Sequence, residues 1–411
     1  MTVTQQASAH GTERGLPRLS RTEMKAVGQV RKRGPLSRTA IAELLDTSRA
    51  SVTSIVGNLM EMNVLTEVGH GKSDGGRRPR LLDINAGLGF IAGVDIGATS
   101  VDLALADFRG EILERRSDVA DVRTAPDQLL NTINDMVSEM LNQHGADDSH
   151  LLGIGMGVPG PVHFPTGVLI RPPLMPAWEG FPIKDFLRDR FPNARPVVDN
   201  DVNIMALGEA SVGGGVGLDN FFYIKIGTGI GCGIIVDGEI YRGSDGCAGD
   251  VGHICVDYNG PICHCGNAGC LEFMAAGPAM AEKARLAAKN GEGKLLAKAL
   301  KDKDGQLTSV DVGEAAAAGD QAANKIIEES GRMIGGVLAG LVNFYNPKAI
   351  FIGGGVSNIG HQFLSTIRQA TLRRATALST RSLQIDYSKL GSDAGVHGAI
   401  WLAIENTFAL A

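Results

Sequence analysis

The stretch that decides the fold reads Gly249-Asp250-Val251-Gly252-His253, then nine residues, then Cys263-His264-Cys265-Gly266-Asn267-Ala268-Gly269-Cys270-Leu271-Glu272. Three thiols and one imidazole form a complete tetrahedral ligand set for zinc and leave no position for water, as in structural zinc sites. Apparent zinc-binding energies of about 10–16 kcal/mol are enough to fold a loop. The pattern therefore predicts a structural zinc ion bound by His253, Cys263, Cys265 and Cys270.

The cysteine distribution leaves two alternatives open. His264, between two of the predicted ligands, is a rival nitrogen donor, and the thiols could instead be buried or incidental. All six cysteines lie between Cys232 and Cys270, which a disulfide framework for 411 residues would not require. Clustered cysteines with metal-ligand spacing are typical of a reducing compartment, so we expect a cytoplasmic protein.

Three strand-like segments outside this stretch each run into a glycine turn. Such turns present backbone N–H groups to phosphate. One D-x-G-x-T turn is weak evidence, because any β-hairpin can supply it, but three separated turns favour a two-lobed nucleotide clamp over a single dinucleotide fold. The candidate phosphate-binding residues are Asp95, Gly97 and Thr99, then Gly227, Thr228 and Gly229, then Gly353, Gly354 and Gly355.

A fourth motif, Pro196-Val197-Val198-Asp199-Asn200-Asp201, places polar residues where a strand gives way to a helix. Asp201 is well placed to act as a general base, with Asn200 beside it to hold a hydroxyl group. An aspartate that merely caps the following helix explains the spacing equally well.

The charge of the chain is unevenly distributed. Residues 1–80 carry 13 Lys and Arg against 7 Asp and Glu, a net charge of +6, whereas the whole chain carries −6. A basic N-terminal module on an acidic body indicates that only the first part meets a polyanion. The polar residues 1–17 are expected to form a disordered tail.

Capping signals in this module predict three helices, beginning after Ser20, Ser37 and Ser48. Two apolar segments, 64–68 and 81–84, flank a Gly/Arg-rich tip and predict a wing. This helix-turn-helix plan sends the start of the third helix into the major groove of DNA and the wing to phosphates. The alternative is a small helical interaction domain with a solvated basic loop. The candidate DNA contacts are Arg49, Ser51 and Thr53 on the third helix and Arg77, Arg78 and Arg80 on the wing.

These motifs together resemble the ROK family of repressors and sugar kinases, and in particular its regulator branch, over residues 18–405. The resemblance implies an α/β fold with a two-lobed actin-like/hexokinase-like (ribonuclease-H-like) body preceded by a winged helix-turn-helix domain. The expected domains are 18–85 for DNA binding, 88–200 plus the C-terminal helix 392–411 for the first lobe, and 201–391 for the second lobe with the zinc loop.

The resemblance also implies a sugar or sugar-derivative site and, in kinase members, a catalytic base that maps to Asp201. Three departures stand out: Asp250 replaces a usual Glu, Leu174–Trp178 departs from a usual Asn-containing segment, and Ala98 and Ser100 replace Gly and Lys in the first turn. Asp250 is shorter by about 1.5 Å, which puts an ordinary hexose in doubt. The implied effector-binding residues are Gly160, Asn200, Asp201, Asp250, His253 and Glu272.

The sequence therefore predicts a sugar-responsive DNA-binding transcriptional regulator, with repression favoured over activation. It would bind a pseudo-palindromic operator as a homodimer or homotetramer. One alternative is an ATP-dependent sugar kinase with an appended DNA-binding domain, which alone would need ATP and Mg²⁺; another is a zinc-stabilised scaffold. No run of about 18 apolar residues predicts a membrane span.

Overall fold

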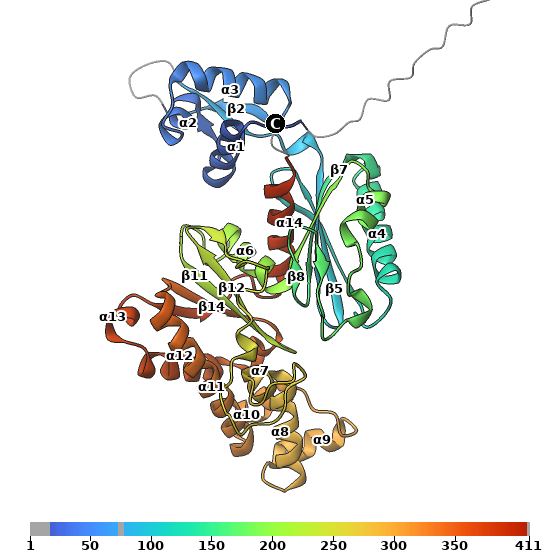
Figure 1. The fold of residues 1–411 in the computed structure, drawn as a ribbon, viewed down its shortest axis with the longest axis vertical. Helices are drawn as coiled ribbons and strands as arrows, with labels where there is room; N and C mark the ends of the chain where they lie inside the picture. Colours follow the sequence, from blue (N-terminus) through green and yellow to red (C-terminus); the bar gives the residue numbers. More distant parts are fainter. Residues whose placement is uncertain (1–16, 73–77, 409–411) are drawn as a thin grey trace, which may run out of the picture.

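The computed structural model describes residues 17–72 and 78–408, which build a small N-terminal unit and two α/β lobes (Figure 1). Each lobe is centred on a five-stranded sheet, and the N-terminal unit carries a three-stranded sheet. The expected α/β class is confirmed. The predicted disordered tail and the wing tip with Arg77 lie outside the described residues.

The N-terminal unit forms three helices at the predicted caps. Ser20 and Glu23 make a reciprocal capping box: the Glu23 carboxylate accepts the Ser20 N–H at 2.8 Å, and the Ser20 hydroxyl accepts the Glu23 N–H at 3.3 Å. The Ser37 and Ser48 hydroxyls cap the next two helices by accepting the N–H of Ala40 and of Ser51, without a reciprocal carboxylate. The elements are α1 Arg21–Arg33, β1 Leu36–Ser37, α2 Arg38–Leu44, α3 Arg49–Glu61, β2 Leu65–His70 and β3 Arg80–Ile84.

The predicted wing is an antiparallel β2–β3 pair, with Leu65 opposite Ile84. The sequence did not predict β1, two residues that pair with β3 on its other edge, Leu36 opposite Leu82. Gly34, with φ 81°, turns the chain from α1 into this strand. The third strand ties the wing to the helices, so the unit is a winged helix-turn-helix.

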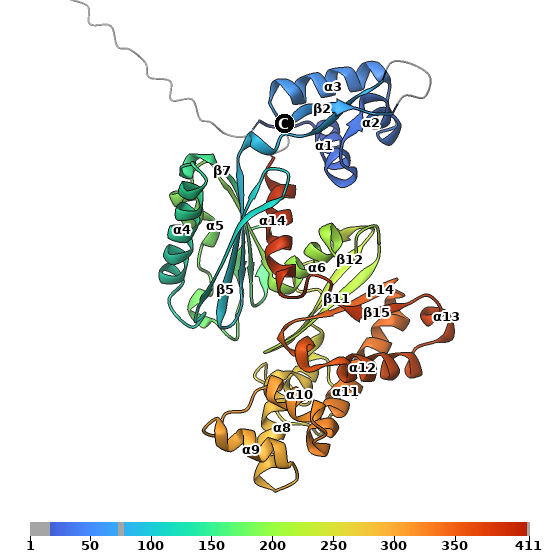
Figure 2. The ribbon, with the colours of Figure 1, turned by 180° about the vertical axis from the view of Figure 1, so that it is seen from behind.

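The first lobe has a sheet in the order β10-β7-β4-β5-β6, and Figure 2 shows α4 and α5 on its outer face. The parallel neighbours β10, β7 and β4 run from one edge to the central strand β4, and β5 and β6 extend the sheet as antiparallel strands. Its elements are η1 Ala86–Leu88, β4 Phe90–Ile96, β5 Ser100–Asp107, β6 Ile112–Val119, α4 Pro126–Gln143, η2 Asp148–His150, β7 Leu151–Val158, β8 Val162–His163, β9 Val168–Leu169, η3 Pro176–Trp178, α5 Ile183–Arg190 and β10 Arg195–Asn200.

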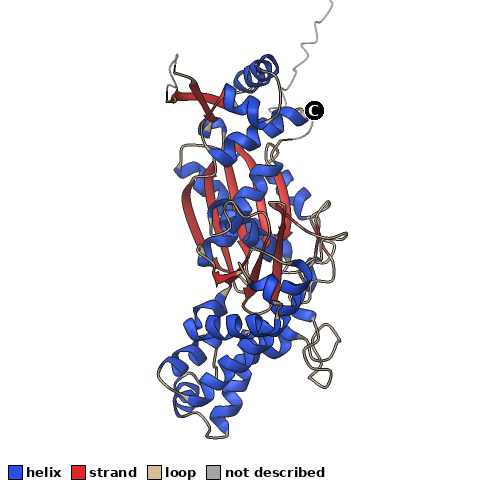
Figure 3. Ribbon diagram, turned by 90° about the vertical axis from the view of Figure 1, so that its left-hand side faces the viewer, coloured by secondary structure: helices blue, strands red, loops and turns tan. Residues whose placement is uncertain are grey.

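The second lobe has a sheet in the order β13-β12-β11-β14-β15, and its helices gather at the end of the molecule far from the N-terminal unit (Figure 3). Its strands are β11 Phe221–Ile226, β12 Ile230–Val236, β13 Glu239–Ile240, β14 Ala349–Gly353 and β15 Gln384–Tyr387. Its helices are η4 Val251–His253, α7 Leu271–Ala275, α8 Gly277–Lys289, α9 Lys294–Asp302, α10 Ser309–Ala317, α11 Gln321–Tyr345, η5 Gly355–Ile359, α12 His361–Arg374, α13 Ala377–Thr380 and η6 Gly391–Asp393.

Two helices, α6 (Asp201–Val212) and α14 (Ala394–Asn406), pack against each other between the two sheets. Their backbones touch, since a Cβ on Gly398 would lie 1.6 Å from the Ile204 carbonyl oxygen and one on Gly208 would lie 2.2 Å from the Ala394 oxygen. Helix α14 also lies on β4 and β7 of the first sheet, whereas α6 lies on β11 and β12 of the second. The pair is thus the joint between the lobes.

The N-terminal unit and the first lobe share one apolar core, which the sequence did not predict. Val27 and Val30 of α1 belong to the same buried cluster as Ile400 and Ile404 of α14 and Phe108 of the first lobe. The Arg31 guanidinium lies over the Phe108 ring, 5.4 Å from its centroid. The described part of the chain holds no helix both long and apolar enough to cross a membrane.

Candidate functional site

The four predicted metal ligands meet in space. The ligand atoms of His253, Cys263, Cys265 and Cys270 all lie within 4.8 Å of one another. Two of their separations, Cys263 Sγ to His253 Nδ1 at 3.7 Å and Cys265 Sγ to Cys270 Sγ at 3.6 Å, match the edges of about 3.5–3.8 Å that a tetrahedron around zinc would have. His264 stands apart, with its ring packed on Phe273, so the rival donor is not part of the cluster.

The chemistry of the cluster calls for a cation. Burial and then the neighbouring thiols raise the pKa of Cys270 to about 12, whereas the backbone N–H of Asn267 lowers the pKa of Cys265. A metal ion would hold both sulfurs as thiolates. Three sulfurs and one nitrogen, with two of the thiols buried, fit a structural zinc ion.

The loop that carries these ligands, residues 249–272 (hereafter the metal loop), also reaches the second glycine turn. Glu272, at the end of the loop, accepts the backbone N–H of Ile230 at 2.9 Å. A Cβ on Gly229 would lie 2.4 Å from a carboxylate oxygen of Glu272, so a larger residue there would displace this carboxylate. The predicted effector residue Glu272 therefore fixes the turn to the metal loop.

Asn200 is the N-cap of α6, and its side chain also forms a hydrogen bond to the loop after β7. Its side-chain oxygen accepts the Val202 N–H at 2.9 Å, and its side-chain nitrogen donates to the Gly160 carbonyl oxygen at 3.0 Å. Asp201 is the first residue inside the helix, so the alternative that Asp201 caps the helix is wrong. The structure brings Gly160, Asn200 and Asp201 to one place, as the resemblance implied.

Asp201 has a partner that the sequence reasoning missed. Its Oδ1 accepts the Val202 N–H at 2.9 Å, and its Oδ2 forms an ion pair with the ammonium of Lys225 on β11. Burial lowers the pKa of Lys225, but the carboxylates of Asp201 and Asp95 outweigh it and hold that pKa above its usual value. The signal was a single charged residue in the otherwise apolar strand Phe221–Ile226.

Asp95, at the end of β4, is a buried carboxyl group with an unsatisfied oxygen. Its Oδ1 has no hydrogen-bond partner among the described residues. Burial raises the pKa of Asp95 to about 7, against the opposing charge of Lys225. The first glycine turn follows directly, with the Gly97 N–H donating to the Ser100 carbonyl oxygen at 2.8 Å, while Thr99 is exposed.

A second ion pair, between Arg242 and Asp199, was also missed. Arg242 Nε lies 2.8 Å from Asp199 Oδ2, and its guanidinium covers the Phe164 ring at 3.7 Å from the centroid. Asp199 Oδ1 accepts the Asn200 N–H and the Asn203 side-chain amide. A carboxylate only 2 % exposed is thus fully satisfied, and it joins β10, the second lobe and the loop after β8.

The second and third glycine turns lie together. Gly354 has φ 87°, and a Cβ there would lie 2.5 Å from the Ile226 carbonyl oxygen, so the position requires glycine. A Cβ on Gly227 would have the Gly355 amide nitrogen as its nearest neighbour, at 3.8 Å. Thr228 is exposed at the hairpin between β11 and β12. The sequence predicted the positions of all three glycine turns along the chain, but it did not predict that the second and third turns lie next to each other.

Asp250 is the most exposed of the predicted effector residues. It lies 3.8 Å from His253 Nε2, beyond hydrogen-bond distance, and its side chain is 60 % exposed. The Asp250 carboxylate is therefore open to solvent.

The predicted DNA-contacting residues at the start of α3 are all exposed, but their hydroxyl groups have local partners. The Ser51 hydroxyl pairs with Ser48 at 2.9 Å, and the Thr53 hydroxyl donates to the Arg49 carbonyl at 2.8 Å. Arg49 is exposed on this surface. On the wing, Arg80 forms an ion pair with Glu67 at 2.5 Å, whereas Arg78 is exposed. Arg80 therefore braces β2 against β3.

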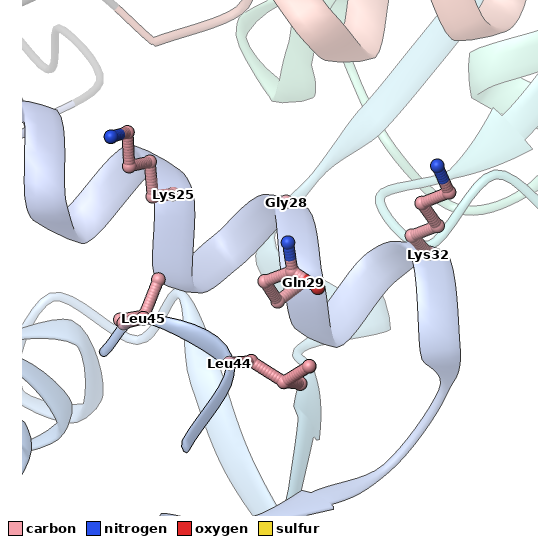
Figure 4. A pocket seen from close by; sticks show the side chains of 6 residues that line it. All are labelled: Lys25, Gly28, Gln29, Lys32, Leu44 and Leu45. Atoms are coloured by element: carbon pink, nitrogen blue, oxygen red, sulfur yellow. The ribbon is translucent and has the colours of Figure 1, made fainter. Parts of the chain in front are cut away.

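An open hollow lies between α1 and α2 of the N-terminal unit (Figure 4). Its polar residues, Lys25, Gln29 and Lys32, all come from α1, and Leu44 and Leu45 of α2 form its apolar side. It contains none of the predicted effector residues and no carboxylate, so it is separate from the cleft.

Comparison with known proteins gives a consistent result. The model of the ROK family matches residues 91–406. A putative xylose repressor of Caldicellulosiruptor sp. (strain Rt8B.4) is 32 % identical over 376 residues, which cover 91 % of this chain and 93 % of the relative.

Two solved structures are similar in fold. A ROK family transcriptional regulator, described as a homologue of the E. coli MLC protein, has a TM-score of 0.80, with 24 % identity over 94 % of this chain and 96 % of its own. A ROK family glucokinase from Streptomyces griseus, in complex with glucose and AMPPNP, has a TM-score of 0.66, with 32 % identity over 77 % of this chain and 99 % of its own. The two differ in whether the N-terminal unit is matched.

Proposed function

The chain belongs to the ROK family, and on that premise we propose that it is a sugar-responsive transcriptional regulator in which a cleft ligand controls DNA binding. The observation that carries this is the connection between the two ends of the molecule. Helix α6 begins at Asn200 and Asp201 and packs on α14, which enters the core of the winged unit. A ligand that moves the start of α6 thus moves the winged unit.

The coupling is stiff at both of its contacts. Between α6 and α14 it is backbone against backbone at Gly208 and Gly398, which leaves no side chain to absorb a shift. Between α14 and the winged unit it is a common buried cluster that also includes Phe108 of the first lobe. The ligand acts to the extent that it binds one arrangement of the lobes more tightly than the other.

The DNA-binding surface is the start of α3 together with the wing. Arg49 would read a base edge in the major groove, and Arg77 and Arg78 would neutralise phosphates. A pseudo-palindromic operator calls for a two-fold symmetric pair, so we propose a homodimer, with a tetramer as its doubled form. Repression is the proposed sign.

The effector is proposed to be a sugar or sugar derivative held near Gly160, Asn200 and Asp201, with the metal loop closing the site. We propose a structural zinc ion in the cluster of three thiols and one imidazole, where it fixes Glu272 and His253 in place. The proposed role of the metal is structural, because the four protein ligands fill a tetrahedron and leave no position for water or substrate.

The experiment that tests this function is binding of the purified protein to DNA from upstream of its own gene. Fluorescence anisotropy would be recorded with a panel that includes xylose, glucose, N-acetylglucosamine and sugar phosphates. We expect sequence-specific binding that one compound weakens at least about tenfold, a coupling of about 1.4 kcal/mol. Operator affinity that no member of the panel changes would contradict effector control.

The DNA surface is tested in the same assay by salt dependence. Arg77→Ala with Arg78→Ala should weaken binding to all sequences and lower the salt slope by about one to two units. Arg49→Ala should relax sequence preference at one operator position and cost about 1–3 kcal/mol there. The matched control is Arg188→Ala on α5 of the first lobe, which should change neither quantity.

A further inference from the structure

The candidate base of the cleft is occupied by an internal cation. Both oxygens of Asp201 are in use: a backbone N–H of α6 binds one, and the ammonium of Lys225 binds the other. Asp201 is 4 % exposed, and its two oxygens keep lone pairs that can still accept a hydroxyl hydrogen. An ion-paired carboxylate is, however, a weaker proton acceptor than a free one, which lowers its strength as a general base.

The strand β11 holds Lys225 in this position. The neighbours of Lys225 on the adjoining strands are Gly231 of β12 and Gly353 of β14. Both register partners are glycines, and the Tyr223 hydroxyl fills the space over Gly353, while the lysine stem runs on the face of the sheet that packs against α6. A Cβ on Gly231 would touch Val202 of that helix, which places the same face against the residue that follows Asp201.

The charge of Lys225 also reaches the nucleotide side of the cleft. Burial lowers the pKa of Lys225, whereas the charges of Asp201 and then Asp95 raise it, and Asp201 is also its ion-pair partner. The positive charge of this ammonium group offsets the negative charge of both carboxylates without a metal ion or a nucleotide.

We propose that Lys225 is a built-in block to phosphoryl transfer, an internal counter-ion that holds Asp201 as a ligand-binding group and keeps the kinase-like body from acting as a kinase. This goes beyond regulation by sugar, because it identifies one residue that separates binding from catalysis in this cleft. Lys225 acts through Asp201 and is therefore a positioning residue.

The chemistry that becomes available without Lys225 is a balanced transfer from Mg²⁺–ATP. The Asp201 carboxylate takes the proton of the sugar hydroxyl, whose oxygen forms a bond to the γ-phosphorus. The bond between that phosphorus and the β,γ-bridging oxygen breaks, and ADP leaves with the electron pair.

The test uses Lys225→Thr in the full-length chain, since threonine is favoured in strands and removes both charge and stem. Sugar-dependent ADP release from Mg²⁺–ATP would be measured with glucose, xylose and N-acetylglucosamine, and the product checked by mass for one added phosphate. We expect the wild type at background and the variant about a hundredfold above it, the scale of a general base.

Three matched variants make the result specific. Lys225→Arg keeps the ion pair and should stay silent, and Lys225→Thr with Asp201→Asn should return to background. Lys348→Thr, an exposed lysine at the far end of the same sheet, should behave as the wild type. Lys225→Gln, which keeps a longer polar side chain, replaces the threonine variant if thermal melting shows that the latter does not fold.

Two outcomes would overturn the proposal. One is a wild type that phosphorylates sugar as fast as the Lys225 variants. The other is a folded Lys225 variant that binds sugar by calorimetry but releases no sugar-dependent ADP. DNA binding is scored separately on the same preparations, so failure of the regulator function and failure of this proposal are distinguishable.

Discussion

The proposed sugar side of the site and its proposed nucleotide side differ in how well their buried charged groups are satisfied. On the sugar side, Asp199 is fully hydrogen-bonded and paired with Arg242, and Asn200 uses both ends of its amide. On the nucleotide side, Asp95 is buried with an unsatisfied oxygen, and Lys225 extends to Asp201. Unsatisfied buried groups cost free energy that a bound partner would recover. The first region is therefore satisfied without a ligand, whereas the second has a buried oxygen without a partner among the described residues.

The largest expected effect comes from the metal loop, which supports the sugar side. Cys270→Ser removes a buried ligand, so we expect zinc affinity to fall by more than about 100-fold and sugar binding to be lost with it. Metal content and calorimetry measure the two losses. Cys247→Ser, at an exposed cysteine outside the cluster, is the control and should keep both. Sugar binding that survives without zinc would separate the loop from the site.

Next in size is the buried ion pair of the sugar side. Arg242→Met leaves Asp199 charged and unpaired, and we expect the free energy of unfolding to fall by about 3–5 kcal/mol in urea denaturation. Arg188→Met removes an equally short but exposed pair with Asp185 and should cost less than about 1 kcal/mol. Equal losses of unfolding free energy in both variants would mean that the Arg242–Asp199 pair stabilises the fold no more than an exposed ion pair does.

On the proposed nucleotide side, the buried carboxyl group of Asp95 lowers the stability of the fold when it loses its proton. Since burial raises the pKa of Asp95 from 3.8 to about 7, the folded chain holds this proton more tightly than the unfolded chain. Its contribution to stability is fully present below pH 3.8 and is lost as the pH rises through 7. Asp95→Asn should therefore reduce the fall in stability between pH 5 and pH 8 by about 2 kcal/mol.

Urea denaturation at several pH values measures the slope of the unfolding free energy against pH. Asp135→Asn, on the exposed face of α4, is the control and should leave the slope as in the wild type. An Asp95→Asn slope that matches the wild type would show that Asp95 is already neutralised by Lys225.

The smallest expected effect is at Asn200. Asn200→Ala removes the N-cap of α6, so we expect a loss of about 1 kcal/mol in the free energy of unfolding. Asn200→Asp keeps the capping oxygen but loses the donor to the Gly160 carbonyl, so it should retain stability and lose sugar affinity. If the aspartate variant bound sugar normally, the tie to Gly160 would have no role in the site.

Local signals in the sequence predicted the elements that local chemistry decides. The serines at the starts of α1, α2 and α3 cap them as expected, and the histidine and cysteines of the metal loop meet as their spacing indicated. Pairings between distant segments, Lys225 with Asp201 and Arg242 with Asp199, were not predictable, because tertiary packing alone brings these side chains together.

The shared core of the winged unit was missed for the same reason. The apolar residues of α1 read as the inner face of a small domain, and nothing in their periodicity says that part of that face is covered by a helix at the other end of the chain. The short strand β1 was missed because two residues carry no alternating pattern.

The place of α14 in that core has a consequence for synthesis of the chain. The ribosome makes the winged unit first and α14 last, and at about 5–20 residues per second roughly 15–60 s pass between them. Until Ile400 and Ile404 emerge, α1 lacks part of its apolar partner surface. A nascent chain that does not yet include α14 therefore lacks part of this apolar core, and under the proposed function it would not yet be competent to bind an operator.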